Sequence, residues 1–255
     1  MSRRFRPHIL RFDSLPSTNT EAQRQAVQGA PEGLCVVARE QTKGRGRAGR
    51  VWVSPPDAGL YFSIVLRPVR LNVRAWPLLT LMSALAVRDA LLETCELETD
   101  IKWPNDILVN ERKLCGILAE TIETETGRAV VIGIGINLNE RAFPPDLKAV
   151  ATSVSALTAK TIDAEALLQS LIRALGERYQ LLQAGNGAEE LIREWSLRSS
   201  YAHNRRVRVT LVRETFIGWT RGLEPDGALR VETDQGEIRV VRAGDVTSVR
   251  VTGDG

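Results

Sequence analysis

The chain has 255 residues, of which 25% are charged, with 34 Lys and Arg against 31 Asp and Glu and a formal net charge of +3. This near balance excludes the strong basic bias of a dedicated nucleic-acid binder and identifies no partner by itself. The length exceeds the roughly 100 to 200 residues of a usual single domain, so one large domain and one small domain are expected.

Three cysteines, Cys35, Cys95 and Cys115, are widely separated and form no CxxC pattern. Neither a disulfide framework nor a zinc site is indicated, and a reducing, cytoplasmic compartment is expected. The opening "MSRRFRPHIL" lacks the apolar segment of a secretory signal. The longest apolar run, "LLTLMSALAV", is much shorter than the about 20 residues that span a bilayer. We therefore expect a soluble protein with no membrane partner.

The first elements are predicted to be a strand, a helix and two further strands. "HILRFDSL" alternates like a strand, and "STNTEAQRQAV" follows as a helix in which Thr18 and Glu21 have the spacing of a capping box. Ser17 to Asn19 are thus expected at a strand-to-helix junction. "LCVVARE" and "LYFSIVLRP" predict two buried strands, with the segment "QTKGRGRAGRVW" between them.

The middle of the chain predicts a helix, a β-rich region and two more helices. Apolar residues recur at helical spacing from Trp76 to about Thr94, and Arg88, Asp89 and Glu93 supply a polar face, which indicates a packed amphipathic helix. "TDIKWPNDILVNERKLCGILAETIE" and "RAVVIGIGINLN" are β-rich, with turns at Pro104-Asn105-Asp106 and Asn110-Glu111-Arg112. "DAEALLQSLIRALGERYQLLQA" and "AEELIREWSLRS" predict helices without an obvious reactive constellation.

Past Ser200 the sequence changes to short alternating strands with turns at Pro225-Asp226-Gly227 and Gln235-Gly236. We expect a domain boundary near Tyr201 to Asn204, which gives a large domain at 1–202 and a module at 203–255. About five short strands in a module of this size predict a small SH3-like or related barrel.

The segment from Gln41 to Trp52 places Lys43, Arg45, Arg47 and Arg50 among three glycines without a carboxylate. Glycine lets a backbone approach a ligand closely, and arginine presents a planar fork of donors to carboxylates and phosphates. The pattern predicts an anion clamp that is mobile when empty, because like charges repel, and orders around an anionic ligand. A solvated linker or a nucleic-acid-binding tract are the alternatives, although both usually occur in polar surroundings rather than between apolar strands.

Five motifs in order, "STN", "GRGRAGRVW", "KWPNDI", "RKLCGIL" and "GIGIN", resemble biotin protein ligases, which activate biotin with ATP and attach it to a lysine of a biotin-carrier domain. The resemblance runs from about His8 to Val251. It implies an α+β fold of the class II aminoacyl-tRNA-synthetase-like type, a mixed β-sheet with helices on one side, plus the small C-terminal SH3-like barrel. Residues 1–202 would be the biotin- and ATP-binding catalytic domain.

The resemblance also implies a role for individual residues. The biotin-binding residues would be Ser17, Thr18, Asn19, Gln41, Arg45, Gly46, Arg47, Lys113 and Gly116. The ureido group of biotin would lie at Ser17, Thr18, Asn19 and Gln41. The nucleotide-binding residues would be Arg47, Arg50, Trp52, Lys102, Asn105, Lys113 and Asn137. The catalytic residues would be Arg45, Arg47, Lys113 and Asp106. Whether Trp52 is an apolar lid or ordinary core packing stays open.

The implied substrates are biotin and ATP, with Mg²⁺ as the metal and Asp106 as its candidate ligand. Arg45, Arg47, Lys113 and Mg²⁺ would neutralise the repulsion between the biotin carboxylate and the ATP α-phosphate. The product, biotinyl-5′-AMP, would be shielded from water by the loop. Asp106 or the departing phosphate would then take the proton of the acceptor lysine, whose free pKa is about 10.4.

The implied partner is a biotin carboxyl carrier protein, with the enzyme as a monomer or a homodimer. About sixteen residues before Ser17 are too few for a three-helix DNA-binding unit, so we expect a monofunctional ligase without DNA binding. The C-terminal module is expected to dock the acceptor or to complete the nucleotide site. Rival hypotheses are a lipoate ligase, whose arginine and glycine motif is organised differently, and a nonenzymatic nucleic-acid-binding protein, which leaves "STN", "KWPND" and "GIGIN" unexplained.

Overall fold

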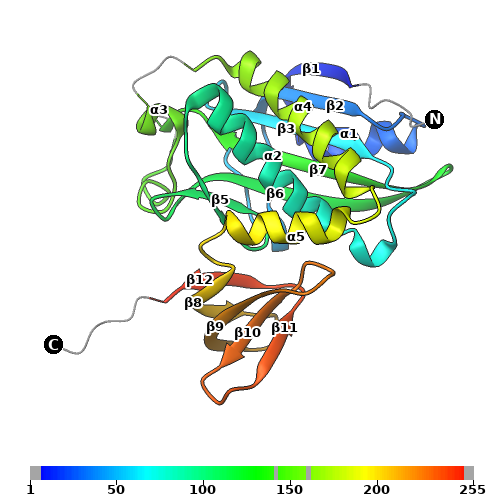
Figure 1. Ribbon diagram of the computed structural model, residues 1–255. Helices are drawn as coiled ribbons and strands as arrows, with labels where there is room; N and C mark the ends of the chain where they lie inside the picture. Colours follow the sequence, from blue (N-terminus) through cyan, green and yellow to red (C-terminus); the bar gives the residue numbers. More distant parts are fainter. Residues whose placement is uncertain (1–6, 141–142, 159–161, 250–255) are drawn as a thin grey trace.

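The computed structural model describes residues 7–140, 143–158 and 162–249, and Figure 1 shows a large sheet with helices packed on it above a smaller sheet. The outer ends of the two expected domains, 1–6 and 250–255, lie outside the described residues. Among the residues that are described, no helix is long and apolar enough to cross a membrane.

The large sheet has the mixed character that was expected. Its strands are β1 (His8–Leu15), β2 (Leu34–Gln41), β3 (Gly59–Leu66), β4 (Asp100–Lys102), β5 (Asp106–Val109), β6 (Arg112–Thr124) and β7 (Gly127–Asn137). They lie in the order β1-β2-β3-β7-β6-β5-β4, with β1 and β2 parallel and the other pairs antiparallel. The helices are α1 (Thr18–Val27), α2 (Leu78–Cys95), α3 (Val154–Leu157), α4 (Ala164–Leu182) and α5 (Gly187–Leu197), and short 3-10 turns cover Arg47–Gly49 and Val73–Ala75.

The two faces of this sheet have different partners because side chains alternate along each strand. Even-numbered residues of β3 and β7, such as Phe62, Ile64 and Ile132, join the core formed with α2 and α4. Odd-numbered residues such as Val65 and Val131 join a smaller cluster beneath α1. The helices on one side are therefore α2, α4 and α5, while the short α1 packs on the opposite face (Figure 1).

The helix expected near residues 76–94 is α2, but its amphipathic character was predicted wrongly. Its buried residues lie all around the helix, because the sheet covers one side and α4 and α5 cover the other. Even Arg88 is only 6% exposed and pairs with Glu98 at 2.6 Å. Its neighbour Asp89 pairs with Arg178 of α4 at 2.5 Å. These ion pairs satisfy the charges that the sequence pattern had placed on a solvent face.

The capping box expected at the start of α1 is not formed. Ser17 is the N-cap residue, with extended backbone and no side-chain cap hydrogen bond. Glu21 instead accepts hydrogen bonds from Arg24 and Gln25 within the helix. The polar side chains at this junction point toward neighbouring strands and a cavity, so they line that cavity instead of capping the helix.

The small sheet is antiparallel and follows α5 directly. Its strands are β8 (His203–Thr210), β9 (Thr215–Leu223), β10 (Leu229–Thr233), β11 (Ile238–Val241) and β12 (Asp245–Ser248), in the order β11-β10-β9-β8-β12. Val207, Leu229 and Val231 are buried within it, which confirms the small β domain predicted from the strand pattern. The Trp103 Nε1–H donates to the Gly227 carbonyl at 3.0 Å and ties this domain to the large one.

Candidate active site

A cavity of about 490 Å³ opens on the α1 face of the large sheet, which is within the usual size of small-molecule sites. It is enclosed by the start of α1, the arginine- and glycine-rich loop, strands β5 to β7 and the edge of β12. The structure brings together in its lining every site residue suggested by the sequence, namely Ser17, Thr18, Asn19, Gln41, Arg45, Gly46, Arg47, Arg50, Trp52, Lys102, Asn105, Asp106, Lys113, Gly116 and Asn137.

The floor of the cavity is made of glycines on β6 and β7. In "IGIGIN" the isoleucines Ile132, Ile134 and Ile136 are buried, and the alternation turns Gly133 and Gly135 toward the cavity. A Cβ atom on Gly133 would lie 2.2 Å from Asn19 Oδ1, and one on Gly135 would lie 2.5 Å from Trp52 Nε1. Any side chain at either position would therefore displace a wall of the cavity.

The wall at the start of α1 is a network of short polar side chains. Gln41 Oε1 accepts from the Thr18 N–H at 2.8 Å and from Thr18 Oγ1 at 3.1 Å, while Gln41 Nε2 donates to Ser54 Oγ at 2.9 Å. Ser63 Oγ lies 2.6 Å from Asn19 Oδ1 and 2.8 Å from Thr18 Oγ1. These bonds fix the direction in which each donor and acceptor points.

The loop over the cavity is a tight hairpin. Arg45 and Val51 form an antiparallel bridge, and the Gly46 N–H donates to the Arg50 carbonyl at 2.7 Å. The turn places Ala48 in the left-handed region, with a φ of 53°. Gly44 has to be glycine, since a Cβ there would lie 2.2 Å from the Trp52 carbonyl oxygen.

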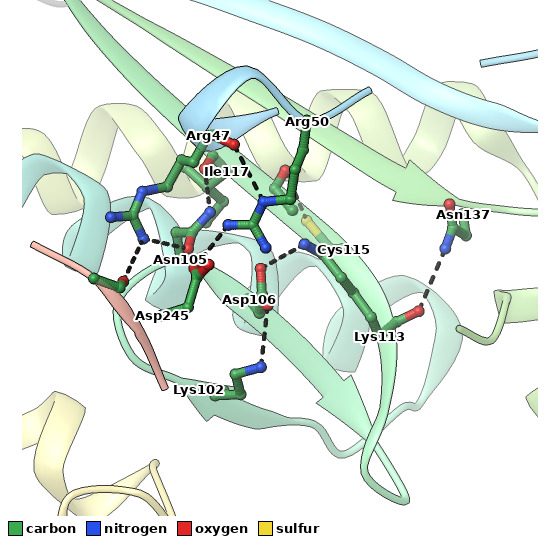
Figure 2. Close-up of polar contacts among 12 residues, drawn as sticks. Arg47, Arg50, Lys102, Asn105, Asp106, Lys113, Cys115, Ile117, Asn137 and Asp245 are labelled. Atoms are coloured by element: carbon green, nitrogen blue, oxygen red, sulfur yellow. Dashed lines mark hydrogen bonds and ion pairs between the residues drawn. The ribbon is translucent and has the colours of Figure 1, made fainter. Parts of the chain in front are cut away.

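Two arginines of the hairpin reach across the cavity (Figure 2). Arg47 Nη1 donates to Asn105 Oδ1 at 3.1 Å and to the Gly244 carbonyl at 3.5 Å, and Arg50 Nη2 contacts Asp245 Oδ1 at 2.7 Å. Burial lowers the pKa of the Arg47 guanidinium, but an arginine remains charged at neutral pH because its ordinary pKa lies far above neutrality. No sequence motif pointed to Asp245, whose carboxylate offsets part of the charge repulsion expected within the loop.

Cations outnumber anions at the centre of the cavity. Asp106 Oδ1 lies 2.6 Å from Lys113 Nζ, and Asp106 Oδ2 lies 3.5 Å from Lys102 Nζ. Arg47 approaches from the hairpin on the other side (Figure 2). Lys113 Nζ also lies over the Trp52 ring, 5.4 Å from its centroid. One carboxylate between two lysines and a neighbouring arginine leaves an excess of positive charge, which favours an anionic ligand.

Two asparagines hold the backbone around this centre. Asn105 Nδ2 donates to the Ile117 carbonyl at 2.8 Å, and its Oδ1 accepts from Arg47. Asn137 Nδ2 donates to the Thr152 carbonyl at 3.0 Å and lies 3.4 Å from the carbonyl oxygen of Lys113. Both side chains thus fix the positions of the cationic residues beside them.

The Trp52 ring packs on the glycine floor and lines the cavity. Its Nε1–H is buried and has no hydrogen-bond partner within the described residues. A buried donor without a partner is uncommon and carries a desolvation cost. The Trp52 ring therefore forms part of the cavity wall against which a ligand can pack.

The sequence left open that the C-terminal module completes the nucleotide site, but it did not point to the residues that reach this cavity. Tyr201, Thr247 and Ser248 line it together with Glu111. Arg205 forms an ion pair with Glu111 and stacks over Tyr201, 5.1 Å from the ring centroid. No motif marks these residues in the sequence, because they come together only when the small sheet packs against the β5–β6 turn. The glycines Gly133 and Gly135 were also missed, although the alternation in "GIGIN" pointed to them.

A magnesium ion would find few protein ligands here. Within the described ranges, no group of three or more His, Cys, Asp or Glu side chains is arranged to hold a metal ion. Asp106 offers two oxygens at the centre of the cavity, both beside lysines. This donor set fits Mg²⁺ that arrives on ATP, since such ions usually take one or two carboxylates and keep phosphate oxygens and waters as further ligands.

Two family models match parts of the chain. Residues 11–137 match the Biotin/lipoate A/B protein ligase family, and residues 202–247 match the Biotin protein ligase C terminal domain. The chain is 39% identical over 244 residues to the bifunctional ligase/repressor BirA of Bacillus subtilis, covering 94% of this chain and 73% of that protein. It is 35% identical to the biotin–[acetyl-CoA-carboxylase] ligase of Mycobacterium tuberculosis, covering 92% and 86% respectively.

A solved structure of biotin protein ligase from Aquifex aeolicus in complex with biotin and ATP superposes with a TM-score of 0.82 at 29% identity, covering 95% of this chain and 99% of that one. The ligase from Leishmania major in complex with biotinyl-5-AMP gives a TM-score of 0.64 at 25% identity, covering 93% and 100%.

Proposed function

The chain belongs to the Biotin/lipoate A/B protein ligase family, and within it we infer that the chain is an ATP-dependent biotin protein ligase. Biotin and ATP give biotinyl-5′-AMP and pyrophosphate, and biotin then passes to a lysine of a biotin carboxyl carrier protein with release of AMP. One observation carries the proposal: a single cavity joins a wall of short polar groups, a glycine floor and a group of cations.

The polar wall suits the ureido group of biotin. Thr18, Asn19 and Gln41 offer hydroxyl and amide groups that are already held in place, and a ureido group presents one carbonyl acceptor and two N–H donors. The glycine floor leaves room for the bicyclic ring and the apolar chain of biotin beside Trp52. Preorganised polar groups lose little entropy when the ligand arrives.

The cationic centre suits the reacting anions. The biotin carboxylate attacks the α-phosphorus of ATP, a bond to the bridging oxygen breaks, and pyrophosphate leaves with its electron pair. Lys113 and Arg47 lie where they can neutralise the carboxylate and the phosphate, while Lys102 and Arg50 extend the positive charge toward the leaving group. Such catalysis works by position and electrostatics and needs no enzyme nucleophile.

Asp106 holds Lys113 and Lys102 in place before the substrates bind. In the transfer step, the acceptor amine attacks the biotinyl carbonyl and must lose a proton. We propose that Asp106 or the departing phosphate accepts it. If Mg²⁺ accompanies ATP, Asp106 would be its protein ligand and the ion would supply further charge neutralisation at the phosphates.

The hairpin protects the intermediate. Biotinyl-5′-AMP is a mixed anhydride that hydrolyses in water, so a site that excludes water preserves it. The contacts of Arg47 and Arg50 with Gly244 and Asp245 join the hairpin to β12. We propose that the small domain completes the nucleotide side of the cavity, where Thr247 and Ser248 lie.

For the described residues we propose no DNA-binding role. Relatives of this chain include biotin–[acetyl-CoA-carboxylase] ligases, and their names support a carboxylase carrier domain as the acceptor.

The test is ATP–pyrophosphate exchange by the purified protein with biotin, with lipoate and with neither. Exchange that requires biotin is expected, together with its loss in Arg47→Ala and Lys113→Ala. Exchange with lipoate alone would transfer the chain to the lipoate branch of the family, and no exchange with either acid would refute the ligase activity.

A further inference from the structure

Glu120 of β6 is not among the residues suggested by the sequence. One of its carboxylate oxygens nevertheless accepts hydrogen bonds from three side chains beside the cavity. Glu120 Oε2 accepts from Asn19 Nδ2 at 2.8 Å, from Gln23 Nε2 at 3.0 Å and from Arg45 Nη2 at 2.7 Å. Asn19 and Gln23 are one helical turn apart on α1, so they present their amides to the same side. Arg45 comes from the hairpin, which makes Glu120 a shared acceptor for two elements.

The register of the sheet explains why this carboxylate faces the cavity side. Glu120 pairs with Val131 on β7, and Val131 belongs to the cluster beneath α1. Leu118, two residues earlier, pairs with Gly133 and contributes its carbonyl as a second acceptor for Asn19 Nδ2, at 3.2 Å. Both N–H groups of the Asn19 amide therefore donate to β6, while its Oδ1 accepts from Ser63 of β3 and keeps a second lone pair for a ligand.

Arg45 differs from the other hairpin arginines in what it contacts. Arg47 reaches Asn105 at the cationic centre and Arg50 reaches β12, whereas the guanidinium of Arg45 forms its ion pair with Glu120. The pair lies where the hairpin leaves β2, since Arg45 bridges to Val51 on the returning strand. A bond at this position fixes the hairpin beside the wall assigned to the ureido group.

We propose that Glu120 is a positioning residue that holds the hairpin closed over the biotin end of the cavity through Arg45, so that the pair sets retention of biotin and of biotinyl-5′-AMP rather than the rate of the chemical step. This inference rests on the proposed function. It also gives Arg45 a role different from that of a cation at the reacting phosphate. With Arg50 and Asp245, the hairpin is then tied at one side to β6 and at the other to β12.

The test compares Glu120→Gln, Arg45→Gln and the double variant with Glu123→Gln. The Gln substitution at 120 keeps the shape and an acceptor oxygen but removes the charge. Glu123 is the matched control, since it lies on the same strand with a side chain that is 81% exposed and only a long contact of 3.7 Å to Arg128.

The expected result for the two single variants is the same rise, about twofold to fivefold, in the biotin KM of pyrophosphate exchange and in the release rate of biotinyl-5′-AMP, which is the span for a partly exposed ion pair. The kcat of Glu120→Gln at saturating biotin should stay at the parent value, and the double variant should have the same biotin KM and release rate as either single variant because the two residues act as a pair. Glu123→Gln should match the parent enzyme.

Two kinetic results would overturn the inference. A Glu120→Gln enzyme with the parent's biotin KM and release rate would show that the Glu120 carboxylate does not contribute to the retention of biotin or of biotinyl-5′-AMP. A fall in kcat for Arg45→Gln alone would place Arg45 at the reacting atoms instead. Trypsin cleavage after Lys43, Arg45, Arg47 or Arg50 gives a second readout that needs no turnover: it should be faster in Glu120→Gln than in Glu123→Gln. Absence of exchange in the unaltered enzyme would refute the ligase activity, while equal cleavage rates would refute the role of Glu120.

Discussion

Replacing Gly133 with alanine should damage both stability and biotin binding. The added Cβ would lie 2.2 Å from Asn19 Oδ1 and 2.8 Å from Asn19 Cγ. Asn19 has no room to retreat, because it is 3% exposed and its amide is bonded to Ser63, Leu118 and Glu120. Overpacking of this kind costs about 1–3 kcal/mol, so the free energy of unfolding should fall by that amount.

The loss of binding follows from the same clash. Relief requires the start of α1 or strand β7 to move, which misaligns one or two hydrogen bonds in the wall assigned to the ureido group. Each is worth about 0.5–1.5 kcal/mol, and 1.4 kcal/mol is a factor of about ten in an equilibrium constant. The dissociation constant for biotin should therefore rise about tenfold in titration calorimetry.

The control is Gly185→Ala, where no atom lies within 4 Å of an added Cβ. That variant should unfold and bind biotin like the parent. A Gly133→Ala protein that kept the parent's melting temperature and biotin affinity would refute the assignment of the glycine floor.

Further substitutions test other parts of the structure. Asp245→Asn should raise the ATP KM about twofold to fivefold in steady-state kinetics, since it removes the 2.7 Å pair between hairpin and β12. Arg50→Ala should raise the ATP KM further, because it removes a cation proposed for the phosphates as well as the pair; an Arg50→Ala effect no larger than that of Asp245→Asn would refute that role of Arg50. Arg178→Ala should lower the free energy of unfolding by about 1–3 kcal/mol in urea titrations, less than for a fully buried network because its partners are partly exposed. The Arg178 hydrogen bond lowers the pKa of Glu194. Its stabilising effect is therefore fully present above the ordinary glutamate pKa of about 4.3 and is lost as the pH falls through the lowered pKa. A difference in unfolding free energy between Arg178→Ala and the parent that stayed constant into strong acid would contradict this. The native protein should not react with Ellman's reagent until it unfolds, because its three cysteines are buried and burial raises the pKa of the Cys115 thiol.

Much of the fold was predictable because its strands carry clear signals. The alternation of β1, the apolar runs of β2 and β3 and the β-rich segment of β7 marked strands at the observed places, and the turn residues around Pro104 and Asn110 marked the hairpins. The errors came from tertiary context. The charges of Arg88 and Asp89 suggested an exposed face on α2, but partners from outside the helix satisfy them. Glu21 had the spacing of a capping box, but the helix starts one residue earlier than that box requires.

The candidate site was predictable where the local sequence is unusual and unpredictable where the fold combines distant segments. Glycines alternating with arginines or isoleucines have few structural uses, so "GRGRAGR" and "GIGIN" stood out. Glu120 lies 75 positions from Arg45, and Asp245 lies 195 positions from Arg50. No local pattern distinguishes these two acidic residues from others on exposed strands, and only the packing of β6 and β12 around the hairpin reveals them.

The most direct test is a chase experiment on the intermediate. The enzyme is incubated with biotin and ATP without acceptor, freed of unbound ligand, and then given a biotin carboxyl carrier domain. The cavity and its hairpin predict that biotinyl-5′-AMP stays bound and that its biotin passes to one lysine of the carrier as AMP is released. Enzyme that holds no adenylate, or adenylate that never reaches the carrier, would contradict the assignment of this site.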